Sequence, residues 1–425
     1  MCRIEAAAPS CTHQWLCARG IGTKHLVHFT LGLWLICATA LVPAATTNAR
    51  FPPNALPEGV FPIGVWLQQP AHARRYQALG INVYVGLWQG PTAAQLATLK
   101  QAGMPVIATQ NEVGLSAPHR DILVGWLQQD EPDNAQPLVG GVGLARAGWA
   151  SPLSPAEMQK RYQAMRARDP LRPIYMGLGK GVAWDAWIGR GNRKGRPEDY
   201  PEYVKAADIV SFDIYPAAET DPALAGRLEV VAQGVKRLVA WAGPERKVWT
   251  TIGTSRVKNP DARVDPAQIR AQVWMSIIGG ARGIVYFVHQ FKPRFVEASW
   301  FEDPDLPAAI GRINAEVQGL SRIINLPAAQ DAADVSVIGA AGRGNPAEKL
   351  SFTVRRDGCA AYVMVASLLN TPSKLAIQLN LNDNINRIAV ENEGRALQRT
   401  DGRFVDDLPP YGARIYKAVS ASACV

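Results

Sequence analysis

Cysteine is scarce in the part of this chain that can fold into a domain. Four of the six cysteines lie within the first 37 residues, and only Cys359 and Cys424 follow them. Such a chain is not a scaffold held together by many disulfides. The two remaining cysteines could form one disulfide in an oxidising compartment, tying the last segment to its domain, or they could be free thiols.

Charge is low and evenly spread. Charged residues make up 19% and apolar residues 48% of the chain, which is typical of a globular protein and excludes a disordered or integral membrane protein. The formal net charge is +9, but no run of Lys and Arg is interleaved with aromatic residues. The densest basic cluster, residues 192–196, is typical of a solvated loop, so we expect no nucleic-acid partner.

Two ligand-binding signatures are also missing. No glycine-rich phosphate loop follows the first predicted strand, which argues against a nucleotide-binding sheet. His289 has no second His or Cys at the spacing of metal ligands. We therefore expect no metal and no cofactor.

The N-terminal segment has the order of a secretory signal. Basic residues, among them Arg19 and Lys24, precede an apolar stretch over 26–45, and small residues follow it. We expect residues 1–49 to form a leader that sends the protein to the periplasm or outside the cell. An uncleaved anchor is the alternative, in which case the leader would be the only contact with a membrane; the apolar stretch is short for a span.

After the leader, apolar strand-like runs alternate with helix-like segments. Eight such repeats over residues 50–326 predict a (β/α)8 barrel, with a doubly wound parallel sheet as the rival. A clear helix is expected over 154–169, and a long one over 224–241. The predicted strands are 61–67, 81–87, 104–109, 122–127, 172–177, 207–212, 247–252 and 283–288.

The pattern changes after Pro327. Short alternating strands separated by Gly and Asn turns are expected over residues 327–425. They predict a small antiparallel β-sandwich, with strands at 349–355, 360–365, 375–381 and 413–416.

The most informative stretch is the end of the fourth predicted strand. The apolar run 122–127 leads directly into Asp130, Glu131 and Pro132, and the proline prevents the strand from continuing. Two acids at the end of a core strand cost desolvation free energy, and in a parallel barrel that end is where active sites lie. The alternative is an acid pair in a loop that caps the next helix.

These motifs resemble those of clan A glycoside hydrolases. In such barrels the general acid/base is a Glu at the end of the fourth strand, commonly followed by Pro, as Glu131 is here. The segment 211–216, Ser-Phe-Asp-Ile-Tyr-Pro, resembles their sixth-strand signature, and 280–287 resembles their entry into the eighth strand. The resemblance implies hydrolysis of an oligo- or polysaccharide, with Glu131 as the general acid.

The chain departs from this family at the seventh strand. Retaining members have a second Glu there, but residues 249–255 contain no carboxylate. One reading is inversion, with Asp213 or Glu112 as base across a gap of about 6.5–9.5 Å that holds a water. A second is substrate assistance, as in N-acetylhexosaminidases, with Asp130 orienting the acetamido group. A third is a barrel that binds sugar without cleaving it.

Aromatic and polar residues near the predicted strand ends support a sugar site. Aromatic faces stack on sugar rings, and amide or imidazole groups bond hydroxyls. Trp126 and Tyr286 could equally belong to the barrel core. Lys180, Glu297 and Asp303 are held in reserve as residues that could reach the site. The expected sugar-binding residues are Trp66, Trp88, Asn111, Glu112, Trp126, Gln129, Tyr215, Tyr286 and His289.

Overall fold

The computed structural model describes residues 59–116, 120–138, 148–329, 331–338, 349–380, 385 and 387–419. The predicted leader over 1–49 and Cys424 lie outside these residues, whereas Cys359 is described and is held in a disulfide. Within the described residues, no helix combines the length and apolar character needed to cross a membrane.

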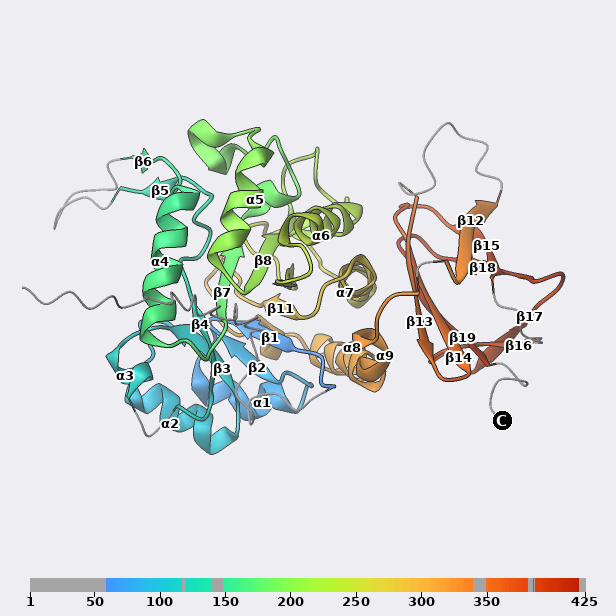
Figure 1. The fold of residues 1–425 in the computed structure, drawn as a ribbon, viewed down its shortest axis with the longest axis horizontal. Helices are drawn as coiled ribbons and strands as arrows, with labels where there is room; N and C mark the ends of the chain where they lie inside the picture. Colours follow the sequence, from blue (N-terminus) through green and yellow to red (C-terminus); the bar gives the residue numbers. More distant parts are fainter. Residues whose placement is uncertain are drawn as a thin grey trace, which may run out of the picture. The chain divides into compact units, whose positions relative to one another are not determined.

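The first part of the chain is a closed parallel barrel surrounded by helices (Figure 1). The last strand pairs with the first, with Ile63 beside Ile284, and this closure excludes the open doubly wound sheet. The seventh strand is interrupted at Trp249, so that its two pieces, β9 and β10, both pair with β8. The strands are β1 Ile63–Trp66, β2 Val83–Val85, β3 Val106–Thr109, β4 Leu123–Leu127, β7 Ile174–Leu178, β8 Ile209–Ile214, β9 Lys247–Val248, β10 Thr250–Gly253 and β11 Ile284–Phe287.

The helices begin and end at residues suited to those positions. Thr92 and Asp265 form capping boxes with a Gln three residues later, and Gly103 ends α2 in the left-handed conformation. The helices are α1 Ala73–Gln77, α2 Ala93–Ala102, α3 Glu112–Leu115, α4 Pro155–Arg168, α5 Tyr200–Tyr203, α6 Glu229–Ala242, α7 Pro266–Gly279, α8 Leu306–Gly319 and α9 Ser321–Asn325. Short 3-10 helices are η1 Pro70–His72, η2 Lys180–Val182, η3 Ile188–Arg193, η4 Pro197–Asp199, η5 Val204–Ala206, η6 Pro216–Ala218 and η7 Ser299–Glu302.

One helix starts later than the sequence predicts. The pattern suggested a helix from Leu224, but α6 begins at Glu229. Residues 224–228 form turns instead, with Gly226 at a φ of 76° and its N–H donating to the carbonyl of Pro216. The positive φ of this glycine interrupts a right-handed helix, which the apolar periodicity alone could not reveal.

Alternation along each strand divides the barrel core into two layers. On β2, Val83 and Val85 belong to the cluster inside the barrel. Trp249, between β9 and β10, belongs to the same cluster. Tyr84 points the other way and belongs to the larger cluster that includes residues of the helices. Both faces of each parallel strand are therefore covered, which explains why the strands read as continuous apolar runs.

The second part of the chain is the predicted antiparallel β-sandwich. One sheet has the order β12-β15-β18 and the other β13-β14-β19-β16-β17, and a separate apolar cluster lies between them. A short hairpin of β5 Gln136–Pro137 and β6 Trp149–Ala150 belongs to the barrel part. The sandwich strands are β12 Ala333–Ile338, β13 Leu350–Asp357, β14 Ala360–Ser367, β15 Ser373–Leu379, β16 Arg387–Val390, β17 Arg395–Gln398, β18 Arg403–Leu408 and β19 Ala413–Val419.

Strand β14 is buried on both faces because its sheet also packs on the barrel. Val363 and Val365 belong to the sandwich core, whereas Met364 belongs to the cluster that includes Trp274 of α7. Arg270 of α7 strengthens this junction. Its guanidinium donates to both carboxylate oxygens of Glu316, at 2.8 and 2.6 Å, and to the carbonyl of Ala413, at 2.9 Å.

Truncating Met364 should therefore weaken the junction. Met364 is fully buried, so Met364→Ala removes apolar contacts and leaves a cavity that costs about 2–5 kcal/mol of unfolding free energy. Phe352→Ala, at a side chain that is 38% exposed on the adjacent β13, is the matched control and should change it by no more than about 0.5 kcal/mol. Urea unfolding followed by tryptophan fluorescence measures both. Equal midpoints for the two variants would contradict this account of the junction.

Candidate active site

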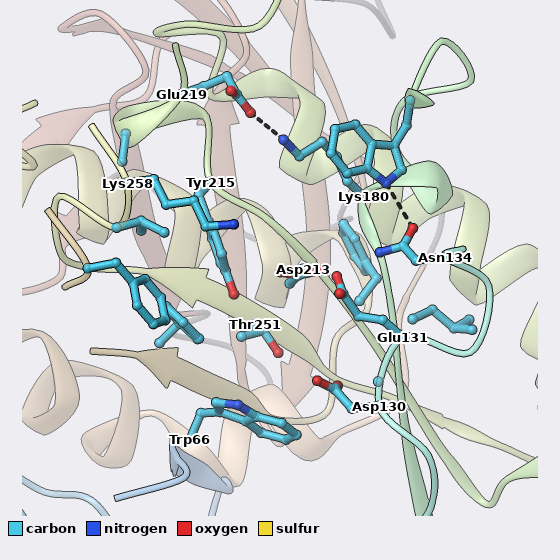
Figure 2. A pocket seen from close by; sticks show the side chains of 18 of the residues that line it. Trp66, Asp130, Glu131, Asn134, Lys180, Asp213, Tyr215, Glu219, Thr251 and Lys258 are labelled. Carbon is cyan, nitrogen blue, oxygen red and sulfur yellow. Dashed lines mark hydrogen bonds and ion pairs between the residues drawn. The ribbon is translucent and has the colours of Figure 1, made fainter. Parts of the chain in front are cut away.

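A cavity of about 470 Å³ lies at the carboxyl ends of the barrel strands. Its lining residues come from six strands or the loops that follow them, so the closed barrel brings together residues far apart in the sequence. Figure 2 shows these side chains from close by. The strand-end residues that line it include Trp66, Asp130, Glu131, Lys180, Asp213, Tyr215, Thr251 and Phe287.

Glu131 is held in a strained backbone conformation. Its φ is 42°, in the left-handed region that a glutamate rarely adopts. Its N–H donates to the carbonyl of Gly177 at 2.9 Å, and its own carbonyl accepts from the N–H of Asn134 at 3.1 Å. Leu67 and Val257, which follow other barrel strands, also have positive φ angles. Strain of this kind persists only where the surroundings over-determine the conformation, and it clusters at functional sites.

The carboxyl groups of Glu131 and Asp213 line the same part of the cavity (Figure 2), close enough for each to shift the pKa of the other. Burial raises the pKa of Glu131 well above its usual range, and the charge of Asp213 raises it further. Burial also raises the pKa of Asp213 to about 6, opposed by interactions with Glu131 and Tyr215. The pair therefore favours the state in which Glu131 keeps its proton while Asp213 is ionised.

Two neighbours favour the ionised form of Asp213. The hydroxyl of Tyr215 and the charge of Lys180 both act to lower the pKa of this carboxyl. Burial and the charge of Asp213 are the main causes of the raised pKa of Glu131, and the charge of Asp133 adds to them.

The inverting reading uses Glu131 and Asp213 as acid and base. An inverting pair needs about 6.5–9.5 Å between its carboxyls, because a water must fit between them. Both residues line the cavity, and each shifts the pKa of the other. Inversion by this pair stays a prediction.

Asp130 occupies a different side of the same cavity. Its carboxyl points toward Thr251 and Trp66 (Figure 2). The residue is exposed to solvent in the open cavity. The protein atoms packed around its carboxyl displace water and raise its pKa to about 8, and repulsion from Glu131 and Asp133 adds to this effect. Close approach to β7 requires a glycine there: a Cβ at Gly177 would lie 2.9 Å from Oδ1 of Asp130. Two neighbouring residues of the chain thus present two acids to separate parts of the cavity.

The loop that carries these acids is held from behind by Asp133. This carboxylate is fully buried. It accepts hydrogen bonds from the N–H of Gly179 at 2.8 Å and from the hydroxyl of Tyr200 at 2.9 Å. The guanidinium of Arg190 donates to its main-chain carbonyl and favours its ionised form. Asp133 therefore positions the segment after β4 rather than facing the cavity.

Three residues missed from the sequence shape one wall beside Lys180, namely Asn134, Trp187 and Glu219. Lys180 forms an ion pair with Glu219, and its Nζ lies 4.3 Å from the ring centroid of Trp187. The indole N–H of Trp187 donates to Oδ1 of Asn134 at 2.8 Å. Although burial acts to raise it, Lys180 holds the pKa of Glu219 below its usual value. Lys180 had been named as a residue that could reach the site. Of the three missed residues, only Asn134 could have been found from the sequence, because it lies three residues after Glu131.

Two expected sugar-binding residues belong to the core and do not line the cavity. The indole N–H of Trp126 donates to Asp169 at 3.2 Å, and the hydroxyl of Tyr286 donates to Oδ1 of Asn314 at 2.8 Å. Both side chains are fully buried on the helix-facing side of the strands. In a closed barrel successive residues point in opposite directions, so a strand-end position does not by itself give an inward side chain.

Other expected residues have local structural contacts outside the cavity. Asn111 caps α3 by accepting the N–H of Gly114, and Glu112 pairs with Arg168. Gln129 donates to the carbonyl of Asp130. Trp88 is 71% exposed after β2. Of the expected substrate residues, Trp66 and Tyr215 line the cavity.

The expected sugar-binding residue His289 and the two reserve carboxylates, Glu297 and Asp303, also lie outside the cavity lining. His289 is buried beside the amide of Gln68, and burial lowers its pKa to about 4, so that it is neutral above that pH. Glu297 accepts the N–H of Gln69. Asp303 accepts the N–H groups of Asp305 and Leu306 at the start of α8. Neither reserve carboxylate supplies a nucleophile to the cavity.

The described ranges contain no group of three or more His, Cys, Asp or Glu side chains arranged to hold a metal ion.

At the end of β10, where retaining clan A enzymes have their nucleophile, Thr251 faces the cavity, and its hydroxyl lies 3.3 Å from that of Ser211. The acids of the cavity are therefore Asp130, Glu131, Asp213 and the lysine-paired Glu219.

Comparison with known proteins gives no family. No family model matches the chain, and no curated protein matches it. Among solved structures, an α-amylase from Geobacillus thermoleovorans complexed with acarbose is 10% identical, with a TM-score of 0.49, over 86% of this chain and 99% of that one. A putative α-galactosidase from Bacteroides fragilis is 11% identical, with a TM-score of 0.49, over 85% and 79%.

A family 30 glycoside hydrolase, a xylanase from Clostridium acetobutylicum, is likewise 11% identical, with a TM-score of 0.42, over 85% of this chain and 96% of that one. These proteins are what the chain is similar to in overall arrangement. At such identities and scores the likeness assigns no activity, and a function has to be argued from the cavity itself.

The raised pKa of Asp130 should make stability depend on pH. The pKa of Asp130 rises from an ordinary 3.8 to about 8 in the folded protein. Between these values the folded state keeps a proton that the unfolded state has lost, so its contribution to stability is full below pH 3.8 and is lost as the pH rises to about 8. Asp130→Asn should therefore flatten the fall of the unfolding free energy across this range. Urea unfolding at a series of pH values measures it. A slope equal to that of the wild type would refute the assignment.

Proposed function

We propose that this chain is an exported glycoside hydrolase that cleaves glycosidic bonds of an oligo- or polysaccharide, with Glu131 as the general acid. One observation carries the proposal: Glu131 follows β4 in a cavity at the mouth of the barrel, half-buried beside Asp213, where its pKa is raised well above the usual range. A general acid must be protonated at the working pH and must reach the leaving oxygen.

Asp213 supports this role by tuning Glu131. While Asp213 is ionised, its charge makes Glu131 bind its proton more tightly. After Glu131 has given the proton to the leaving oxygen, two carboxylates lie close together, and their repulsion raises the basicity of Glu131. Glu131 can then remove a proton from the water that completes hydrolysis. The same group thus acts first as acid and then as base.

The nucleophile is the step in which the chain differs from retaining clan A enzymes. Because no carboxylate ends β10 while Asp130 and Glu131 are adjacent acids of the cavity, we favour substrate assistance over attack by a carboxylate. The acetamido carbonyl oxygen of the sugar would attack C1 as the bond to the leaving oxygen breaks and Glu131 donates its proton. Water would then reopen the ring so formed, losing its proton to Glu131. Asp130 would bond the acetamido N–H.

Export is the second part of the proposal. The leader-like segment over 1–49 supports it, with its basic residues before an apolar stretch. The disulfide at Cys359 also supports it, because such bonds persist in oxidising compartments. Fractionation of cells that make the full chain tests this part separately from the enzyme assay.

Glu131→Gln should remove most turnover while the fold is kept, because Gln has a similar shape and no acidic proton. We expect kcat to fall by about a hundredfold to ten-thousandfold. Glu245→Gln, at a carboxylate on the surface between α6 and β9, is the matched control and should leave kcat unchanged. Release of reducing ends from a panel of plant and bacterial polysaccharides measures turnover. Full activity of Glu131→Gln would end the assignment.

A binding module is the alternative function, and the absence of a carboxylate on β10 is the observation that favours it. In that case no polysaccharide of the panel would be cleaved, but soluble oligosaccharides would raise the melting temperature.

Substrate assistance gives a separate expectation. Of two aryl glycosides that differ only at carbon 2, the one with an acetamido group should be cleaved and the one with a hydroxyl should not, because only the former carries the attacking oxygen. The first-formed sugar should have the anomeric configuration of the substrate, read by proton NMR. An inverted product, or equal cleavage of both glycosides, would exclude substrate assistance while leaving Glu131 as the acid.

A further inference from the structure

A series of neighbouring aromatic rings leads from the acids of the cavity to the surface. The ring of Tyr215, which reaches Asp213, stacks on Phe287 with centroids 5.1 Å apart. Phe287 lies 6.3 Å from Phe291, and Phe291 lies 5.8 Å from Phe295. The first three rings line the cavity. The aromatic surface therefore continues without a break from the bottom of the cavity to the loop between β11 and α8.

The outer two rings are open to solvent. Phe291 is 40% exposed and Phe295 60% exposed. Beneath them, the buried imidazole of His289 is stacked on both, with interplanar angles of 15° and 26°. Because this imidazole is neutral above about pH 4, it supports the phenyl rings without adding a charge. Phe291 and Phe295, whose ring planes are inclined by 39°, thus form an exposed apolar surface, which we call the platform.

The loop that carries the platform is fixed by main-chain hydrogen bonds. Gln290 and Val296 exchange N–H···O=C bonds of 2.9 and 2.8 Å, which close the loop on itself. The N–H of Phe291 donates to the carbonyl of Val257 at 2.7 Å, on the loop after β10. A ligand would find these rings already in position, so little conformational entropy would be lost on binding.

The chemistry beside the platform fits a carbohydrate. Phe291 shares the cavity wall with polar side chains of the neighbouring loops, Asn259 and Glu219 among them. A sugar ring has an apolar C–H face and a rim of hydroxyls, so it needs an aromatic face with hydrogen-bonding groups at its edge. Since the rings are continuous with the cavity, a glycan bound at Glu131 would run along them.

We propose that Phe291 and Phe295 form a binding subsite for further sugar units of a chain whose scissile bond lies at Glu131. This inference rests on the proposed function for the position of the scissile bond. It adds that the natural substrate is an oligomer that extends beyond the cavity, and that affinity grows with its length.

The test measures binding without turnover. In the full-length Glu131→Gln protein, calorimetry gives the affinities of dimers and hexamers of N-acetylglucosamine, of β-1,4-linked glucose and of β-1,4-linked xylose. We expect one hexamer to bind more tightly than its dimer. Replacing both Phe291 and Phe295 by Ala should weaken that hexamer by about tenfold and change the dimer by less than about twofold. Phe352→Ala, an exposed phenylalanine of the sandwich, is the matched control and should change neither.

Three results would overturn the platform: equal weakening of dimer and hexamer, an unchanged hexamer affinity, or no binding of any oligomer. Its failure can be told apart from that of the hydrolase. If the wild type cleaves a hexamer and the double variant keeps its kcat/KM on hexamer and dimer alike, the platform fails and the hydrolase stands. If nothing is cleaved but hexamer affinity depends on the two rings, the platform stands and the hydrolase fails.

Discussion

The repulsion between the neighbouring carboxyls of Glu131 and Asp213 is the constraint around which the barrel mouth is arranged. Two acids that lie close together and are partly removed from water do not both ionise readily, so one keeps its proton. This cost has to be met by the rest of the fold. The ion pair of Lys180 and Glu219 nearby, the hydroxyl of Tyr215 and the amide of Asn134 all bear on which of the two acids holds the proton.

The backbone is shaped to bring these acids together. Glu131 adopts a positive φ, and Asp133 anchors the following turn through Gly179 and Tyr200. Gly177 on β7 leaves the space into which Asp130 fits. These features do not improve packing. A positive φ at Glu131 and a fully buried Asp133 both cost free energy of folding, and an apolar strand end would need neither. Their combination is what one expects where stability has been given up for chemistry.

The same cavity contains a separation of tasks. Glu131 and Asp213 form one titrating pair, and Asp130 is a distinct acid on the side of Thr251 and Trp66. The aromatic rings on the β11 side contribute apolar surface and no charge. A polar centre for bond cleavage beside an apolar face for binding is an arrangement suited to sugars, whose hydroxyls and C–H faces need both.

The sequence by itself determined the architecture. Apolar runs with intervening helix patterns are local signals, and eight of them in order gave the barrel, as alternating short strands gave the sandwich. It also determined that Asp130 and Glu131 lie at a strand end, because an apolar run that a proline ends is a local sequence pattern.

Tertiary structure alone decided the rest. Trp126 and Tyr286 face the helices, because strand pairing sets which residues point inward. Glu219 and Trp187 reach the site from loops without periodicity. The distance between Glu131 and Asp213 depends on barrel closure, which no local pattern encodes.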